Sequence, residues 1–137
     1  MMSPIADALY RFGLAYDTAD FSLLESALTD DAIFSINDTK LHGLQEIRTQ
    51  SFEKVAKLDT THLFSSIRTQ QDGSKATLTA TALANHYPQG KGLAGENRFL
   101  LGGSLYTGEL VFQDGLWKFS KVHLQLVWVN GDMSVLQ

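Results

Sequence analysis

The sequence contains no cysteine, which excludes disulfide bonds, thiolate metal sites and a cysteine nucleophile. Its eleven lysine and arginine residues are scattered from Arg11 to Lys121 without forming a cluster, so we expect no nucleic-acid-binding surface. No uncharged apolar run approaches the ~18 residues that a membrane span requires, and the first residues lack the basic start and apolar stretch of a signal peptide. From these absences we expect a cytoplasmic protein that makes no contact with a membrane.

What is present is typical of an ordinary folded protein. The chain has 137 residues, of which 44% are hydrophobic and 19% are charged, and its formal net charge is −4. This length is enough to build a real hydrophobic core and fits one domain, so we predict a single domain over residues 1–137.

The first part of the chain has helical patterns. Ser3 and Pro4 form a helix start, and apolar residues then recur at helical spacing until about Thr18. Asp20 can cap a second, short helix over residues 22–27. A polar break at residues 29–31 separates that helix from a short strand predicted at residues 32–36. Gly43 precedes a further helical segment that extends to Leu58.

The second part of the chain has strand patterns. Four long segments alternate between apolar and polar residues, at 60–69, 75–87, 99–112 and 116–129. Asp-Gly turns join the first pair and the last pair, and a glycine-rich loop at 88–97 joins the middle two. Because the helices come first and the antiparallel hairpins follow, the order predicts an α+β fold.

Several short motifs occur in a consistent order along nearly the whole chain. They are Tyr16-Asp17, Ala19-Asp20-Phe21, Thr29-Asp30-Asp31-Ala32, Thr61-His62-Leu63, Asn85-His86-Tyr87, Asp114-Gly115-Leu116-Trp117-Lys118-Phe119, Trp128 and Gly131-Asp132. This ordered set resembles the SnoaL-like and scytalone dehydratase-like proteins of the nuclear transport factor 2-like superfamily. The resemblance implies a cone-shaped half-barrel, in which the N-terminal helices pack in a strongly curved, mixed but mainly antiparallel sheet that encloses a pocket.

Three residues are candidates for acid–base chemistry: Asp17, His62 and His86. Each also has a purely structural explanation, as a solvated aspartate at a helix end or as a histidine satisfied within a strand. His86 ends a stripe of alanines on one face of its strand, which leaves room beside a polar group. The resemblance implies that Asp17 orients His86, and that His62 faces the same substrate. An imidazole titrates near neutral pH and can therefore take a proton from carbon and return it elsewhere.

Four further residues are predicted to contact the substrate: Tyr16, Phe12, Ile36 and Tyr106. Relatives that dehydrate their substrates often have a tyrosine at the position of Ile36, and some have one at the position of Phe12. Isoleucine and phenylalanine cannot hold a departing hydroxyl group. Tyr16 and Tyr106 supply phenols, so proton transfer in general is better supported than loss of water.

The resemblance therefore implies a cofactor-independent isomerase, cyclase or dehydratase that acts on a bulky, apolar, oxygenated natural-product intermediate such as a polyketide, terpenoid or alkaloid. The alternatives are a protein-interaction module of the nuclear transport factor type, which would have a filled cavity, and a ligand carrier without catalysis. No pair of histidines has metal-ligand spacing on a helix and no dinucleotide fingerprint is present, so we predict neither a metal nor another cofactor. A homodimer or homotrimer is expected, formed through apolar residues at Leu124, Leu126 and Trp128 on the outer face of the sheet.

Overall fold

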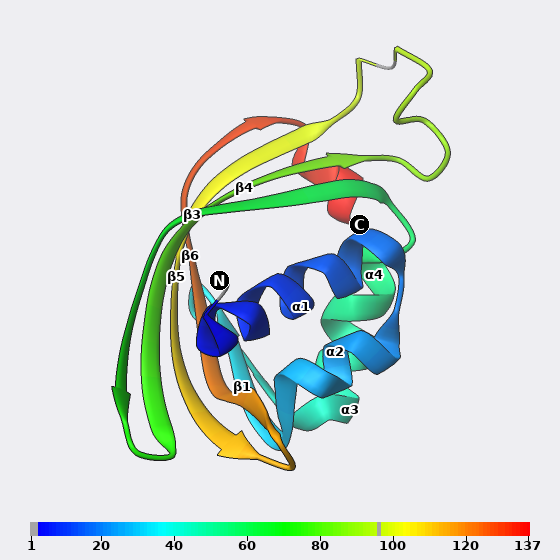
Figure 1. Ribbon diagram of the computed structural model, residues 1–137. Coiled ribbons are helices and arrows are strands. Elements are labelled where there is room, and N and C mark those ends of the chain that lie inside the picture. Colours follow the sequence, from blue (N-terminus) through cyan, green and yellow to red (C-terminus); the bar gives the residue numbers. More distant parts are fainter. Residues whose placement is uncertain (1–2, 96) are drawn as a thin grey trace.

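The computed structural model describes residues 3–95 and 97–137 of the chain (Figure 1). Its helical elements are α1 (Pro4–Thr18), α2 (Phe21–Ala27), α3 (Gly43–Ile47), a π-helical segment (Arg48–Phe52), α4 (Glu53–Val55) and a 3₁₀ helix (Met133–Leu136). Its strands are β1 (Leu28–Ile36), β2 (Thr39–His42), β3 (Asp59–Asp72), β4 (Lys75–Tyr87), β5 (Leu100–Gln113) and β6 (Leu116–Gly131). This composition confirms the predicted α+β class. None of the described helices is long and apolar enough to cross a membrane.

Both N-terminal helices begin where the sequence predicts them, because a side chain caps each one. The Ser3 hydroxyl accepts a hydrogen bond from the backbone N–H of Ala6, and the Asp20 carboxylate accepts one from the N–H of Leu23. Between the two helices, Ala19 adopts a left-handed conformation with φ 54°, which ends α1 and turns the chain into α2.

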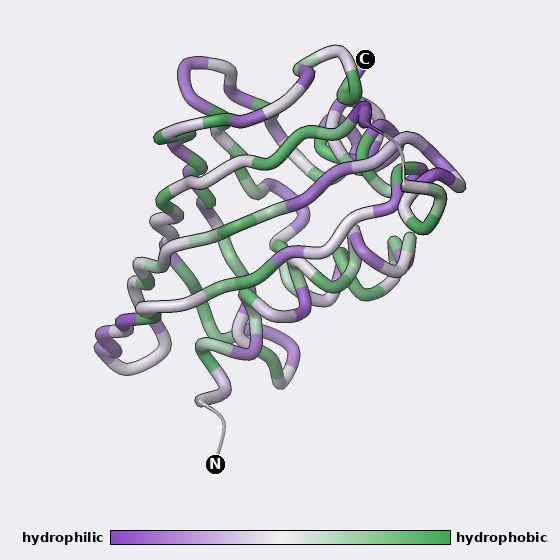
Figure 2. Tube along the Cα trace, turned by 90° about the horizontal axis from the view of Figure 1, so that it is seen from above, coloured by the Kyte–Doolittle hydropathy of each residue, from purple (hydrophilic) through white to green (hydrophobic). Residues whose placement is uncertain are grey.

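The described strands form one mixed sheet in the order β2-β1-β6-β5-β4-β3. β1 and β6 run parallel, and the other neighbours are antiparallel. The sheet curves around α1, while α2, α3 and α4 lie on the side that the sheet leaves open (Figure 1). Both hydrophobic and hydrophilic stretches occur along the strands (Figure 2). Buried and exposed residues alternate along most of β4, so that one face of the sheet is directed toward the interior and the other toward solvent.

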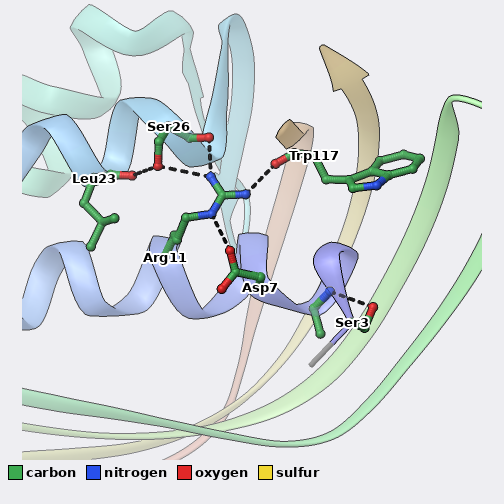
Figure 3. A network of polar contacts seen from close by, with 7 residues as sticks. Ser3, Asp7, Arg11, Leu23, Ser26 and Trp117 are labelled. Atoms are coloured by element: carbon green, nitrogen blue, oxygen red, sulfur yellow. Dashed lines mark hydrogen bonds and ion pairs between the residues drawn. The ribbon is translucent and has the colours of Figure 1, made fainter. Parts of the chain in front are cut away.

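Arg11 joins three of these elements (Figure 3). Its guanidinium donates to the Asp7 carboxylate in α1 at 2.9 Å, to the hydroxyl and carbonyl oxygens of Ser26 in α2, and to the carbonyl of Trp117 in β6 at 2.8 Å. One side chain thereby fixes α1 against both α2 and the sheet.

Several boundaries differ from the prediction. β1 begins at Leu28, so the polar residues 29–31 lie inside the strand, where its register with β6 shifts. The chain forms an additional short strand, β2, because the 37–38 turn closes a hairpin. Beyond the last predicted strand, residues Met133–Leu136 form the 3₁₀ helix, whose Val135 is buried. The loop at 88–97 joins β4 to β5 as predicted, and its residue Glu96 lies outside the described residues.

The expected outward direction of Leu124 and Leu126 is wrong. Both side chains line the interior of the fold. The register between β5 and β6 shifts between Gly103 and Ser104, which inserts Val127 as an extra residue in β6. This insertion turns Trp128 to the outer face, where its indole lies across Gly103 and is 46% exposed.

Candidate active site

The curved sheet and α1 enclose a cavity of about 210 Å³, which is lined mainly by apolar side chains. On β4 the cavity is bordered by Ala84, which pairs across the sheet with Gly102 of β5, another small lining residue. The predicted stripe of alanines therefore leaves open space at its end next to His86, whereas Ala80 and Ala82 are packed in the core. The polar groups that border this space include His62, His86, Tyr16 and Tyr106.

Asp17 and His62 form a hydrogen-bonded pair at the edge of the cavity. The Nδ1 of His62 lies 2.6 Å from the Asp17 carboxylate. The same carboxylate accepts hydrogen bonds from the backbone N–H of His62 at 2.9 Å and from the hydroxyl of Thr60 at 2.8 Å. Because a carboxylate only accepts, Nδ1 of His62 carries a proton, and its Nε2 remains available for other chemistry.

Burial of Asp17 acts to raise the pKa of its carboxyl group, but the hydrogen bonds and the charge interaction with His62, together with the Thr60 hydroxyl, outweigh burial and lower that pKa. The carboxylate is therefore ionised at neutral pH, although its side chain is only 14% exposed. It holds the ring of His62 in one tautomer.

A glycine allows α1 to come close enough to β3 for this contact. Gly13 lies one helical turn before Asp17, on the same side of α1. A Cβ atom at this position would overlap Cε2 of Phe64, lie 2.9 Å from Cζ of that ring and lie 3.4 Å from Cβ of His62. Because glycine has no such atom, α1 packs directly on the strand that carries His62.

The expected pairing of Asp17 with His86 is wrong. α1 crosses β3, the edge strand, and its C-terminus reaches Thr60 and His62 there, whereas His86 lies one strand further into the sheet. The ring of His86 uses its Nδ1 to donate to the carbonyl of Leu100 at 3.1 Å. The Asp17 carboxylate, which the family resemblance implies to orient His86, thus pairs with His62 instead.

His86 nevertheless faces the same cavity as His62. The two rings are 5.9 Å apart between centroids and stand nearly perpendicular, at 87°. Burial lowers the pKa of His86 and the neighbouring His62 lowers it further, while the bond to the Leu100 carbonyl and the charge of Asp17 act in the opposite direction. The net result is a neutral imidazole with Nδ1 protonated and a free lone pair on Nε2.

All four residues expected to contact a substrate line the cavity: Phe12, Tyr16, Ile36 and Tyr106. The Tyr16 hydroxyl lies 2.8 Å from the hydroxyl of Ser51, and either group can donate. The ring of Phe12 packs between Tyr16 and Tyr106, at 5.5 and 6.3 Å. The structure thus gathers at one cavity the acid–base candidates and the predicted contact residues.

A family profile described as the SnoaL-like domain matches residues 2–123. In addition, the chain is 42% identical over 134 residues to the terrestric acid biosynthesis cluster protein E of Penicillium crustosum, covering 96% of this chain and 86% of that protein. The chain belongs to the SnoaL-like family.

Solved structures support the fold expected of a SnoaL-like protein. A candidate scytalone dehydratase from Novosphingobium aromaticivorans superimposes with a TM-score of 0.80 at 18% identity, covering 94% of this chain and 85% of that one. A type 3 LinA hexachlorocyclohexane dehydrochlorinase from Novosphingobium barchaimii superimposes with a TM-score of 0.74 at 20% identity, covering 95% and 88%. These likenesses confirm the cone-shaped α+β architecture of the family.

The cavity of this SnoaL-like chain has polar lining residues that sequence reasoning missed: Asn37, Ser51 and Ser104. Ser51 belongs to the helical segment predicted to extend to Leu58, and an inward serine among apolar residues is the signal that could have indicated it. Met133 and Leu136 of the 3₁₀ helix also border the cavity. Among the described residues, no three histidine, aspartate or glutamate side chains come together as a metal site would require.

Proposed function

We propose that this chain is a cofactor-independent enzyme that moves a proton within a natural-product intermediate, as an isomerase, a cyclase or a dehydratase. The observation that carries the proposal is the hydrogen-bonded pair of Asp17 and His62 at a cavity that a second imidazole, His86, also faces. A protein that only fills its interior with side chains has no need for two imidazoles directed into an open space.

In the proposed mechanism His62 carries the proton. Its Nε2 removes a proton from a carbon of the substrate, and the ionised Asp17 stabilises the imidazolium that forms. The same nitrogen then returns the proton, either to another carbon, which isomerises or cyclises the substrate, or to a departing hydroxyl group, which leaves as water. Because Asp17 keeps the other nitrogen protonated and fixed, the ring performs both steps without turning.

His86 has a different role in this mechanism, and the roles of the two histidines are the reverse of those expected from sequence. Since its Nδ1 is committed to the Leu100 carbonyl, Nε2 of His86 is an acceptor. A neutral acceptor at this place binds a hydroxyl group of the substrate or takes a second proton. The ring of His62 is held by a carboxylate and the ring of His86 by a backbone carbonyl. Because these environments differ, the two imidazoles can take different roles in acid–base chemistry.

The substrate class follows from the cavity and from the relative. A space of about 210 Å³ with mainly apolar walls suits a compact molecule with few polar groups, smaller than the bulky intermediate that the family resemblance implies. The related protein of Penicillium crustosum takes its name from a terrestric acid biosynthesis cluster, which supports a small biosynthetic intermediate for this chain as well.

The test uses the metabolites that accumulate in a Penicillium crustosum strain lacking that relative. The purified chain is incubated with this extract in D₂O, and the products are analysed by mass spectrometry. We expect one metabolite to be consumed. Its product carries deuterium at carbon if the proton is returned there, or is lighter by one water if a hydroxyl group is lost. An extract that the chain leaves unchanged would contradict the proposed substrate class.

Three variants test the assignment of residues with the same assay: Asp17→Asn, His62→Gln and His86→Gln. Loss of a general acid–base group reduces turnover by about 10²–10⁴-fold, and we expect this for His62→Gln. His42→Gln is the matched control, because His42 is an exposed histidine at the end of β2. Full turnover by His62→Gln would refute the mechanism, and binding without turnover by the wild-type chain would indicate a carrier.

We also propose that two copies of the chain associate through the outer face of the sheet. Leu63 and Leu83 are paired across β3 and β4, and Gly103 with the overlying Trp128 continues the same row across β5 and β6. Leu63 is 61% exposed, and Leu105 beside the row is 48% exposed. Apolar residues gathered on one surface in this way are typical of an interface. Light scattering should give a dimer mass for the wild-type chain and a monomer mass for Leu83→Lys, and a monomeric wild-type chain would contradict the proposal.

A further inference from the structure

Tyr106 has a hydroxyl group that the described residues leave without a partner. The residue lies on β5 and faces inward, and its ring packs edge-on against Phe12 at 6.3 Å and Phe64 at 5.4 Å. Only 4% of its surface is exposed. It belongs to the same row across the sheet as Leu124 and, beyond it, Ile36. In this row of the sheet, Ile36 stands on β1 where dehydrating relatives often have a tyrosine, and Tyr106 supplies a phenol on β5 instead.

The hydroxyl of Tyr106 opens onto the cavity. Among the described residues, each fully enclosed side-chain nitrogen or oxygen has a hydrogen-bond partner. Since the Tyr106 hydroxyl has none there, it must border the open space that its side chain lines. Tyr16 differs in this respect, because its hydroxyl is bonded to Ser51. A phenylalanine would fill the position of Tyr106 equally well without burying an unpaired donor, so the hydroxyl has no role in packing.

Tyr106 remains a neutral donor at any physiological pH. Burial raises the pKa of its phenol far above the ordinary value, and the nearby Tyr16 and Asp17 act in the same direction. Ring contacts place Tyr106 beside the residues of the candidate site, because Phe12 packs against both Tyr16 and Tyr106, and Phe64 packs against both His62 and Tyr106. The ring of Tyr16 is itself 6.0 Å from that of His62. A guest oxygen held by Tyr106 therefore lies in the same cavity as the imidazole that moves the proton.

We propose that the hydroxyl of Tyr106 donates a hydrogen bond to a carbonyl oxygen of the substrate. The substrate is therefore a carbonyl compound with a removable proton on the carbon next to that group. This assignment rests on the proposed function for its catalytic part. When His62 takes the proton, the electron pair of the broken C–H bond forms a C=C bond, and the π pair of the carbonyl moves to oxygen. Tyr106 stabilises the resulting enolate oxygen, as donors placed at a developing oxyanion do. Return of the proton from His62 to another carbon reverses the electron flow.

The carbonyl specificity can be tested without the natural substrate. Acetophenone and α-methylstyrene have nearly the same shape, but a C=CH₂ group replaces the C=O group in the second molecule. We expect Tyr106→Phe to weaken acetophenone binding by about two- to tenfold, the effect of losing one neutral hydrogen bond. It should leave the binding of α-methylstyrene unchanged or slightly tighter. Binding is measured by titration of protein amide resonances, and melting temperatures check that the variant is folded.

Infrared spectroscopy supplies a second readout that a packing effect would not produce. The carbonyl stretch of acetophenone bound to the wild-type chain should lie at lower frequency than in an apolar solvent, and Tyr106→Phe should move it back. Tyr10→Phe is the matched control, because Tyr10 is 40% exposed and does not line the cavity. An unshifted band, an equal loss for both probes, or no binding of acetophenone at millimolar concentration would overturn the proposal.

The test of carbonyl binding by Tyr106 can fail or succeed separately from the test of catalysis by His62. His62→Gln should keep the shifted carbonyl band while it loses turnover, since Tyr106 holds the oxygen and His62 moves the proton. A shifted band in a chain whose His62 variant is fully active would refute the proposed function and leave carbonyl binding intact. For the natural substrate, removal of one oxyanion donor by Tyr106→Phe should lower kcat by about 10²–10³-fold.

Discussion

The substitution Gly13→Ala should destabilise the protein, although the same change in a solvent-exposed helix would stabilise it. Alanine is favoured over glycine inside a helix by about 1 kcal/mol. At Gly13, however, the new Cβ would overlap Phe64 and lie 2.9 Å from its Cζ, whereas carbon atoms pack at about 3.5–4.0 Å. The ring of Phe64 packs against Tyr10, His62 and Tyr106, so it cannot turn aside freely. Overpacking of this kind costs about 1–3 kcal/mol.

The net change in the free energy of unfolding should therefore be a loss of about 1 kcal/mol, measured by urea unfolding with an unchanged m-value. The control is a double-mutant cycle with Phe64→Leu, which makes room for the new methyl group. In that background Gly13→Ala should recover its normal helical gain of about 1 kcal/mol in place of a loss of about 1 kcal/mol, so the cycle should show a coupling energy of about 2 kcal/mol. Because Gly13 also sets the distance between α1 and β3, the single variant should disturb the nitrogen resonances of the His62 ring. A single variant more stable than the wild-type chain, with no coupling to Phe64, would refute this explanation of the glycine.

Three further results are expected. The pKa of Asp17 is lowered in the folded chain. Its contribution to the free energy of unfolding is therefore present above the ordinary aspartate pKa of about 4 and is lost as pH falls through the folded pKa. Acid titrations monitored by circular dichroism should show this loss for the wild-type chain and not for Asp17→Asn. The pKa of His86 is also lowered, which means that the unfolded chain binds the proton more readily than the folded chain. The free energy of unfolding should therefore rise with pH from the folded pKa up to about 6.5. His86→Gln should reduce this slope, and an unchanged slope would contradict the burial of a neutral imidazole. Arg11→Met should lower the free energy of unfolding by about 2–4 kcal/mol, measured with urea, because three partners lose a charged donor. The control Arg48→Met removes only an exposed ion pair and a contact with the ring of Phe21, and should cost about 1 kcal/mol or less. Equal costs would show that Arg11 does not fix α1 against α2 and the sheet.

Local signals along the chain were sufficient to predict most of the fold. The caps at Ser3 and Asp20 act within one helical turn, and the hairpin turns act between adjacent strands, so their effect does not depend on distant contacts. The start of β1 was missed for the opposite reason. Residues 29–31 are polar, and they lie in an irregularity of β1 between the pairs Leu28–Phe119 and Ile33–Lys121, so that pairing with β6 on either side keeps them within the strand. In the same way, the extra residue Val127 in β6 has no local signature, and it places Trp128 on the opposite face of the sheet from Leu124 and Leu126, although the alternation predicts all three on one face.

The candidate site shows the same division between local and long-range information. The residue types and the family resemblance single out Asp17, His62 and His86 as the residues of interest. The histidine that pairs with Asp17 could not be predicted, since the choice depends on which strand passes under the end of α1. That geometry depends on the order of strands and on the close approach that Gly13 permits, and neither quantity can be read from periodicity.

The alanines of β4 have a consequence for how such a protein can change. On β4 the cavity is bordered by Ala84, whose side chain is short, and this position holds none of the groups proposed to move protons. Exchange of Ala84 for a longer apolar residue would shrink the chamber from the β4 side, while the aspartate and both imidazoles stayed in place. The size of the accepted molecule and the reaction performed on it are thus determined by separate sets of residues, and one can evolve without the other.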